Sequence, residues 1–511
     1  MLLTVMKDWY NEFSDFESRQ FVSDEGSCLL DRGNSSIEGR RALCGLACMI
    51  IVFGFLLTAC VGQSPERFPT LPSDDSSSSE SVRPTVGLTT PVIFAEPNHL
   101  RFSLPVSPET AERLVRIFSL YMSYAAAGNM AVDFSEEEIQ AVEPLFTYDF
   151  VSCSAAGYSR EEWIQLRDAD RLPDVFPVSG LEWAVKESLL LPLDEYAAFD
   201  RQFSSARLFP GALDSCRIDS VLYGIPYRGA AEVLFFDMRI LSEAGVSEVP
   251  FLLDVDGLTT ISEAVLSAGK TEEEETQRFF PLYSTEELIP FVHSSFAGSQ
   301  RTGYFSFYDG AFHFADQAFA DGIAFLREYR GSGYTFEGLP QETKDLYGED
   351  SPPAAMWIDS TASLTEVSSG AVFSQIPSGV QGAATVPFVH AFPLCVGAAS
   401  DSPKLAFAFA AFLSLSDTAA ELCAEDLYGD SFFPFLSAQE LWEHVYDGSA
   451  YRNEWLSIYQ VLPEAIYFQD SNRGSVMARI RQRITEYSAN LLDEEMNLTQ
   501  VIRVMSGVAV S

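Results

Sequence analysis

Residues 222–227 read LYGIPY, and residues 233–250 read VLFFDMRILSEAGVSEVP. The apolar run from Val233 to Phe236 indicates a buried strand. The segment after it indicates a short helix ending at Gly245, because glycine readily adopts the left-handed conformation that closes many helices. A strand that leads directly into a helix is typical of α/β proteins.

Short strands and helices also alternate outside this stretch. Leu100, Phe102 and Leu104 alternate with other residues as in a strand. Ser107-Pro108-Glu109 then has the N-cap, proline and first-turn acid of a helix start. Asp174-Val175-Phe176 indicates another buried strand. Further helices are predicted at 318–329, from 401 onward and within 475–504. The order predicts an α/β fold with mainly parallel sheets and right-handed crossovers.

The composition allows a large folded body. The chain has 511 residues, of which 47% are hydrophobic and 13% aromatic, which is enough for two to four domains. This excludes a wholly disordered chain and a small disulfide scaffold. Asp and Glu number 73 against 32 Lys and Arg, for a net charge of −41, and no basic patch appears. A nucleic-acid partner is therefore not expected.

The N-terminal part contains an export signal. Arg40-Arg41 precede 18 uncharged residues from Ala42 to Ala59. The run ends in Leu57-Thr58-Ala59-Cys60, which resembles the lipobox of bacterial lipoproteins. We therefore expect cleavage before Cys60 and lipidation of its thiol. An uncleaved membrane anchor is the alternative. Residues 1–39 fit no signal peptide, so they are either a wrongly assigned start or a cytoplasmic extension.

A linker follows the predicted lipidation site. Residues 60–97 are rich in Ser, Pro and acidic residues and have no hydrophobic period. Such a segment cannot bury enough apolar surface to offset its ordering entropy, so we expect a disordered tether.

Searches for catalytic and metal-binding motifs give no match. The chain contains no GxxxxGK[ST], GxGxxG, HExxH or GxSxG motif. Its histidines are scattered, so we expect neither a metal nor a cofactor. A pair of glycosidase-type acids stays open, because carboxylates are abundant and their spacing in the fold is not visible in a sequence. The mature cysteines, Cys153, Cys216, Cys395 and Cys423, are widely spaced, which favours buried free thiols over disulfides.

One ordered series of segments carries a family resemblance. It comprises LPDVF (172–176), LLLPLDEY (189–196), the two segments quoted first, AAMWIDSTASL (354–364) and SDSPKLAFAFAAFLSLSD (400–417). The series resembles the extracytoplasmic solute-binding proteins of ABC importers, specifically the large sugar-binding family. The resemblance extends from about residue 98 to about residue 505.

The resemblance implies a two-lobed periplasmic-binding-protein fold of type II, with a solute held between the lobes. It places hinge crossings near 231–234, 392–396 and 433–437. The expected organisation is an extension with a signal peptide (1–59), a linker (60–97), lobe I (98–232 and 394–435) and lobe II (233–393), with 436–511 as lobe II C-terminal helices that also pack between lobes.

Sugars need aromatic rings against their C–H faces and polar groups for their hydroxyls. Loops at the carboxyl ends of strands are the expected place for such residues. By this rule and by the resemblance, the candidate ligand-binding residues are Ser179, Glu182, Tyr227, Arg228, Tyr283, Trp357, Asp359 and His390. The alternative for each is an ordinary structural or surface role. The family's tryptophan after the AAM strand is replaced here by Ser360-Thr361-Ala362, which weakens the carbohydrate prediction.

Taken together, the sequence predicts a monomeric, lipid-anchored, extracytoplasmic protein that binds a solute without catalysis. A carbohydrate is the favoured solute, and the expected partners are the permease subunits of an ABC transporter and, through Cys60, the membrane. The alternatives are a cell-surface saccharide-acting enzyme of the glycoside hydrolase type and the binding lobe of a sensor system.

Overall fold

The computed structural model describes residues 99–506 with short gaps. The residues left out inside that range are 126–133, 155–156, 201–202, 271–275, 299–303, 309–310, 348–350, 366, 368–369, 427–430, 469–475 and 494. The predicted signal peptide, Cys60 and the linker lie outside the described residues.

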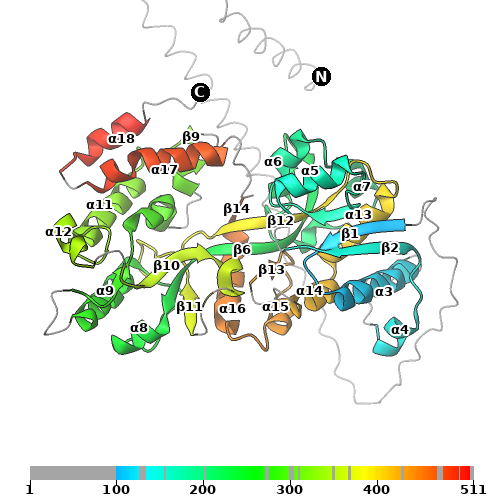
Figure 1. Ribbon diagram of the computed structural model, residues 1–511, viewed down its shortest axis with the longest axis horizontal. Coiled ribbons are helices and arrows are strands. Elements are labelled where there is room, and N and C mark those ends of the chain that lie inside the picture. Colours follow the sequence, from blue (N-terminus) through cyan, green and yellow to red (C-terminus); the bar gives the residue numbers. More distant parts are fainter. Residues whose placement is uncertain are drawn as a thin grey trace, which may run out of the picture. The chain divides into compact units, whose positions relative to one another are not determined.

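A ten-stranded mixed sheet runs through the centre of the fold (Figure 1). Its main path is β2 (Thr147–Ser152), β1 (His99–Leu104), β3 (Val175–Pro177), β12 (Phe388–Val396), β6 (Gly224–Asp237), β10 (Ala354–Ser360) and β7 (Phe280–Leu282). Three strands branch from this path: β11 (Ala371–Ser374) and β13 (Phe433–Pro434) pair with β6, and β14 (Ile466–Phe468) pairs with β12. The outer pairs β1–β2, β1–β3 and β7–β10 are parallel, whereas β6 and β12 run antiparallel to their main neighbours.

Strand β6 connects the two halves of the sheet. From Gly224 to Ala231 it pairs with β12, and from Glu232 to Phe236 it pairs with β10. The sequence predicted only its apolar end, Val233–Phe236. The first half was not recognised as a strand, because glycine, proline and arginine interrupt its apolar pattern.

Two large hydrophobic cores lie on either side of this exchange of partners. Along β6, Val233 and Phe235 belong to the first core, while Leu234 and Phe236 belong to the second. Because successive side chains of a strand point to opposite faces, one strand contributes to both cores.

Helices cover each core (Figure 1). The first core is packed by α3 (Pro108–Ala125), α4 (Glu136–Ala141), α5 (Arg160–Asp168), α6 (Leu181–Lys186), α7 (Asp194–Phe199), α13 (Pro403–Leu415), α14 (Asp417–Ala424), α15 (Gln439–Val445) and α16 (Arg452–Val461). The second core is packed by α8 (Met238–Glu243), α9 (Val255–Gly269), α10 (Val292–Phe296), α11 (Gln317–Gly331), α17 (Val476–Leu492) and α18 (Leu498–Ser506). A short helix, α12 (Gln341–Lys344), has no buried residue.

Several local predictions are confirmed. Helix α3 begins at Pro108, and the Ser107 hydroxyl accepts a hydrogen bond from Thr110 N at 3.2 Å. Helix α8 ends just before Gly245, whose φ is +78°. The predicted helices at 318–329, from 401 onward and within 475–504 are α11, α13 and the pair α17–α18. The caps and apolar periods were sufficient for these elements, because each depends on residues close in sequence.

The chain passes from one hydrophobic core to the other at specific residues. Phe388 belongs to the second core and Val389 to the first. The last change comes after Ala465, because Trp442 and Trp455 of α15 and α16 are buried in the first core. The crossings expected near 392–396 and 433–437 are therefore not where these cores change. We propose that each lobe consists of the segments that pack in one of these two cores. The lobe bounds given in the sequence analysis stay a prediction.

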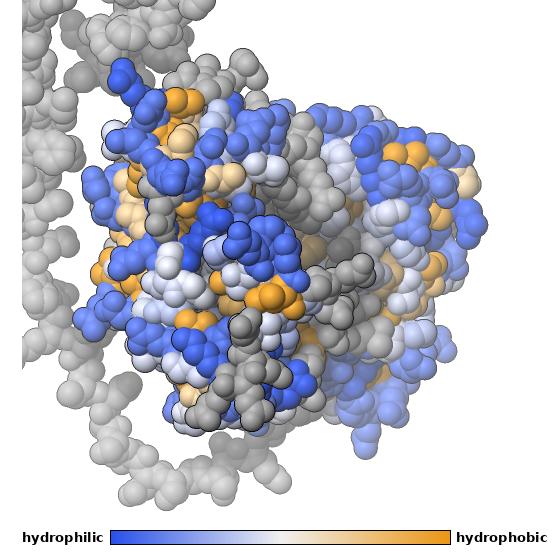
Figure 2. All heavy atoms as spheres, turned by 60° about the vertical axis from the view of Figure 1, so that its left-hand side comes forward, coloured by the Kyte–Doolittle hydropathy of each residue, from blue (hydrophilic) through white to orange (hydrophobic). Residues whose placement is uncertain are grey.

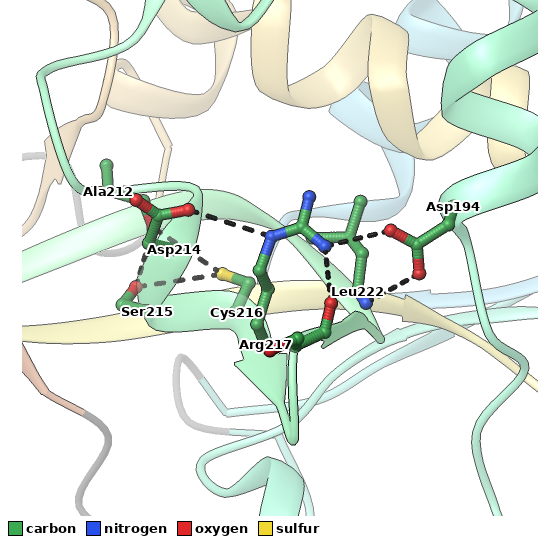
Figure 3. Close-up of polar contacts among 8 residues, drawn as sticks. Asp194, Ala212, Asp214, Ser215, Cys216, Arg217 and Leu222 are labelled. Atoms are coloured by element: carbon green, nitrogen blue, oxygen red, sulfur yellow. Dashed lines mark hydrogen bonds and ion pairs between the residues drawn. The ribbon is translucent and has the colours of Figure 1, made fainter. Parts of the chain in front are cut away.

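A polar clamp fixes the chain just ahead of β6 (Figure 3). The Asp194 carboxylate at the start of α7 accepts hydrogen bonds from Arg217 Nη1 at 2.8 Å and from Leu222 N at 2.9 Å. Partial burial alone would raise the pKa of Asp194, but these hydrogen bonds outweigh it and the pKa lies below its usual value. The clamp holds the small hairpin of β4 (Arg217–Ile218) and β5 (Val221–Leu222) against α7.

The face seen in Figure 2 is mainly hydrophilic, with smaller hydrophobic patches. Among the described residues, no single helix is long and apolar enough to span a membrane. Helices α13 and α14, which meet at a bend of 72°, are together long and apolar enough to span one. Their apolar residues, however, belong to the first core.

The close packing at Gly229 can be tested by adding one methyl group. A Cβ at Gly229 would lie 2.6 Å from Cζ of Phe433, a buried ring of β13. We expect Gly229→Ala to lower the free energy of unfolding by about 1–3 kcal/mol, measured by urea denaturation. Gly448→Ala is the matched control, since nothing lies within 4 Å of its Cβ. Equal stability of the two variants would contradict the packing described here.

Candidate functional site

Two aromatic residues lie at one level of the neighbouring parallel strands β7 and β10, Tyr283 directly after β7 and Trp357 within β10. In the register, Leu282 pairs with Met356, so Tyr283 and Trp357 come next at the same level. Tyr283 lies directly after β7 and is 44% exposed, and its ring packs on Phe336 with centroids 5.6 Å apart. Carboxyl edges of parallel strands are frequent places for ligand sites in α/β proteins.

The Trp357 ring is held in place by the strand beside it. It stacks on Phe235 of β6 with ring centroids 5.5 Å apart and an interplanar angle of 10°. Trp357 is half-buried, so it contributes to the first core and keeps part of its surface in solvent. An aromatic ring fixed in this way loses little conformational entropy when a ligand binds to it.

Two carboxylates lie beside this aromatic pair. Asp359 follows Trp357 by two residues on β10, and its Oδ1 accepts a hydrogen bond from Ser360 N at 2.7 Å. Glu287 comes from the 3-10 segment Thr285–Phe291, and its Oε2 accepts a hydrogen bond from Ile358 N at 3.4 Å. Loss of hydration raises the pKa of the Glu287 carboxyl, and the nearby charge of Asp359 raises it further, against the hydrogen bond from Ile358.

A histidine–glutamate pair lies where β6 exchanges partners. His390 Nε2 of β12 is hydrogen-bonded to Glu232 Oε1 of β6, and both side chains are largely buried. Glu232 is opposite Ser360 in the β6–β10 register, next to the pairing of Val233 with Asp359. Glu232 and Asp359 are thus one register position apart, and their side chains leave the strands on opposite faces of the sheet.

The sequence prediction missed Glu232 and Glu287. Glu232 did leave a signal, since it is a single acid within the apolar run GAAEVLFF (229–236). Glu287 left none, because its neighbour Asp359 is distant in the sequence.

Ser179 and Glu182 lie at the end of β3. Val178 N donates to Pro393 O of β12 at 3.2 Å, which brings the half-buried Ser179 beside that strand. Glu182, in the first turn of α6, forms an ion pair with Lys186 at 2.5 Å. Its carboxylate is therefore engaged with a surface lysine.

Tyr227 and Arg228 point toward α14. Each is 5% exposed. The Tyr227 hydroxyl donates to Cys423 Sγ, and Arg228 Nη2 donates to Cys423 O, each at 3.1 Å. The register of β7 and β10 places Tyr283, Trp357 and Asp359 along neighbouring strands, whereas His390 is bonded to Glu232 and the contacts with Cys423 turn Tyr227 and Arg228 toward a helix. Their roles in ligand binding stay a prediction.

The described residues contain no group of three or more His, Cys, Asp or Glu side chains that could hold a metal ion. Cys153, Cys216, Cys395 and Cys423 are all buried and free in the structure. The expectation of free thiols agrees with this arrangement.

Comparison with known families identifies the chain. The family described as bacterial extracellular solute-binding protein matches residues 165–439, more than half of the sequence. The chain belongs to this family. The predicted membership among extracytoplasmic solute-binding proteins of ABC importers is thereby confirmed, and the family indicates an extracytoplasmic location. A search of curated proteins found no match.

Solved structures show the same fold. This solute-binding protein is similar to an ABC substrate-binding protein from Listeria monocytogenes in complex with cycloalternan, with a TM-score of 0.52 and 13% identity over 80% of this chain and 97% of that one. A cyclic alpha-maltosyl-1,6-maltose binding protein from Arthrobacter globiformis gives 0.53 and 12% over 80% and 97%. A sugar transporter from Rhizobium etli, in an open conformation, gives 0.51 and 12% over 80% and 100%. The predicted two-lobed α/β fold is confirmed.

The environment of Glu287 predicts a dependence of stability on pH. A carboxyl whose pKa is raised by folding stabilises the protein below its ordinary pKa, and this contribution is lost as the pH rises above about 4.5. We therefore expect Glu287→Gln to gain stability relative to the parent protein between pH 4 and pH 7, measured by urea denaturation. The glutamine can still accept the hydrogen bond from Ile358 N.

Glu286→Gln is the matched control, because it removes the exposed acid next in sequence. A gain of the same size in both variants would show that the local environment of Glu287, its lost hydration and the nearby Asp359, is not the cause.

Proposed function

We propose that this solute-binding protein captures a carbohydrate at the strand edge formed by Tyr283, Trp357 and Asp359, and delivers it to the permease of an ABC transporter. One observation carries the proposal: the Trp357 ring is held parallel to Phe235 while two carboxylates lie beside it. A pyranose presents an apolar C–H face and a rim of hydroxyls, and this combination of groups complements both.

The printed names of the similar structures support the same class of solute. The Listeria protein holds cycloalternan, and the Arthrobacter protein binds cyclic alpha-maltosyl-1,6-maltose. Both ligands are oligosaccharides. We extend that class, and no particular sugar, to this chain.

The loss of the family's usual tryptophan has a structural reason. Thr361 stands in that region and is fully buried, and its Oγ1 accepts a hydrogen bond from Ala231 N at 3.1 Å. Ala231 is the last residue of β6 that pairs with β12. Thr361 therefore supports the junction of the two strands, and we assign the role of aromatic platform to Trp357.

Binding is the whole of the proposed task. Closure of two lobes around a solute requires crossing segments that can change their backbone angles, and β6 and β12 are the crossing strands here. A permease would then distinguish the closed form from the open one. We assign no catalytic residue, and we propose that the solute leaves unchanged.

Substitutions at the strand edge test the solute site. We expect Trp357→Ala to weaken binding about tenfold, because a lost stacking partner costs on the order of 1.4 kcal/mol. We expect Asp359→Asn to weaken binding by about 10- to 100-fold through loss of a charged acceptor. Ligands would first be found by a thermal-shift screen of saccharides, polyols, amino acids and peptides, and Kd then measured by calorimetry.

The matched control is Tyr459→Ala, which removes a half-buried aromatic ring of α16 packed on the first core. It should bind like the parent protein. Normal affinity in both Trp357→Ala and Asp359→Asn would place the site elsewhere. A hit that is consumed during incubation would replace the binding function with the enzymatic alternative.

We also propose that Cys60 is lipidated and that 60–97 tethers the body to the membrane. The basis is the sequence Leu57-Thr58-Ala59-Cys60 after an apolar run of 18 residues. We expect Cys60→Ser to abolish incorporation of a labelled fatty acid in growing cells. Labelling that persists in the variant would contradict lipidation at Cys60. An unlabelled parent protein that stays in the membrane would indicate the uncleaved anchor instead.

A further inference from the structure

Arg228 is a buried cation without a carboxylate partner. It is 5% exposed, and its Nη2 donates to the Cys423 carbonyl oxygen at 3.1 Å. Its Nη1 is buried and has no hydrogen-bond partner. No ion pair of Arg228 is present among the described residues.

Among the residues that the structure describes, the ionisable groups that interact with Arg228 supply no carboxylate charge. They are the side chains of Tyr227, Cys423 and Cys153. Burial raises the pKa of Tyr227 well above its usual value, and burial raises the pKa of Cys153 to about 11, so the phenol and this thiol stay protonated near neutral pH. The Tyr227 ring itself lies 5.1 Å from the guanidinium carbon. A contact with a ring face compensates only part of the cost of burying a charge.

A small cavity lies beside this guanidinium. Its volume is about 20 Å³, room for one particle the size of a water molecule. Arg228, Tyr227, Cys423 and Ser414 contribute its polar wall. The Ser414 hydroxyl, at the end of α13, is also buried without a partner. Two buried donors without acceptors therefore line one small cavity.

Within the described part of the chain, the rest of the wall is apolar. It consists of Leu413, Ala420, Ala424, Phe432, Phe433 and Pro434. Among the described lining residues, only Arg228 and Ser414 have side-chain donors without a partner, and a polyatomic anion would need more of them. A monatomic anion needs only the charge of Arg228 and the two donors that have no partner.

We propose that this cavity binds a halide ion, chloride in its natural setting, between Arg228 and Ser414. The ion compensates the buried guanidinium and accepts hydrogen bonds from Nη1 and the hydroxyl. It ties α13 and α14 to β6 close to the point where that strand exchanges partners. The site is separate from the proposed solute site at Trp357 and does not depend on it.

The test is the halide dependence of thermal unfolding. The full chain, purified in detergent, would be unfolded in sodium chloride, bromide or gluconate at constant ionic strength. Chloride and bromide should raise the Tm by a few degrees in a saturable manner, because a ligand that binds only the native state stabilises it. Gluconate is too large for the cavity and should have no such effect.

Three variants test whether the halide dependence of the Tm comes from this cavity. Arg228→Met keeps an unbranched chain without charge and should abolish the halide dependence, while Ser414→Ala should reduce it. Arg330→Met is the matched control, since Arg330 forms its ion pair with Glu337 beside the second core, and it should keep the full dependence. If Arg228→Met does not fold, Ser414→Ala and a bromide-soaked crystal of the unaltered chain still decide the question.

The expected crystallographic result is an anomalous bromide peak next to Arg228 Nη1. Equal Tm values in halide and gluconate would overturn the proposal and leave a water, or a charge supplied by the chain itself, as the occupant. A halide effect that survives in Arg228→Met would overturn it as well, because the ion would then bind elsewhere.

Discussion

The hydrogen bonds of strand β6 are the constraint on which the rest of the structure depends. One continuous strand pairs with β12 up to Ala231 and with β10 from Glu232 onward. A strand has only two edges and two faces, so this exchange fixes which segments can approach each other. It brings the start of β12 beside the end of β10, and it divides alternate side chains of β6 between two cores. Thr361 completes the junction by accepting the Ala231 N–H.

The candidate site is a consequence of that junction. Trp357 owes its orientation to Phe235, which is its partner in the β6–β10 register. Asp359 lies near the exchange point because it is opposite Val233, and His390 meets Glu232 because both flank the same point from different strands. A solute bound here would lie next to the crossing, so we expect binding and lobe movement to be coupled through β6.

The sequence correctly predicted the elements that depend on residues close together in the chain. Caps, apolar periods and the order of short motifs were sufficient for α3, α8, α13 and the family. The sequence could not show which strand pairs with β6, and the Glu287–Asp359 and Glu232–His390 contacts depend on that pairing. The motif around Tyr227 and Arg228 predicted a ligand contact, but a motif carries no information on which face of a strand a side chain takes. The structure turns both toward Cys423, a residue almost 200 positions away.

Two buried polar sites in this protein compensate differently for the loss of hydration on burial. Glu232 and His390 are buried as a pair, so each supplies the partner that the other lost with its water. Arg228 is buried with one carbonyl, one ring face and an unfilled donor. The first pair is formed by two side chains of this protein, and for the second we propose a halide ion as the missing partner. The proposed solute site on β7 and β10 and the proposed halide site beside Ser414 would therefore lie on the two sides of one junction in β6.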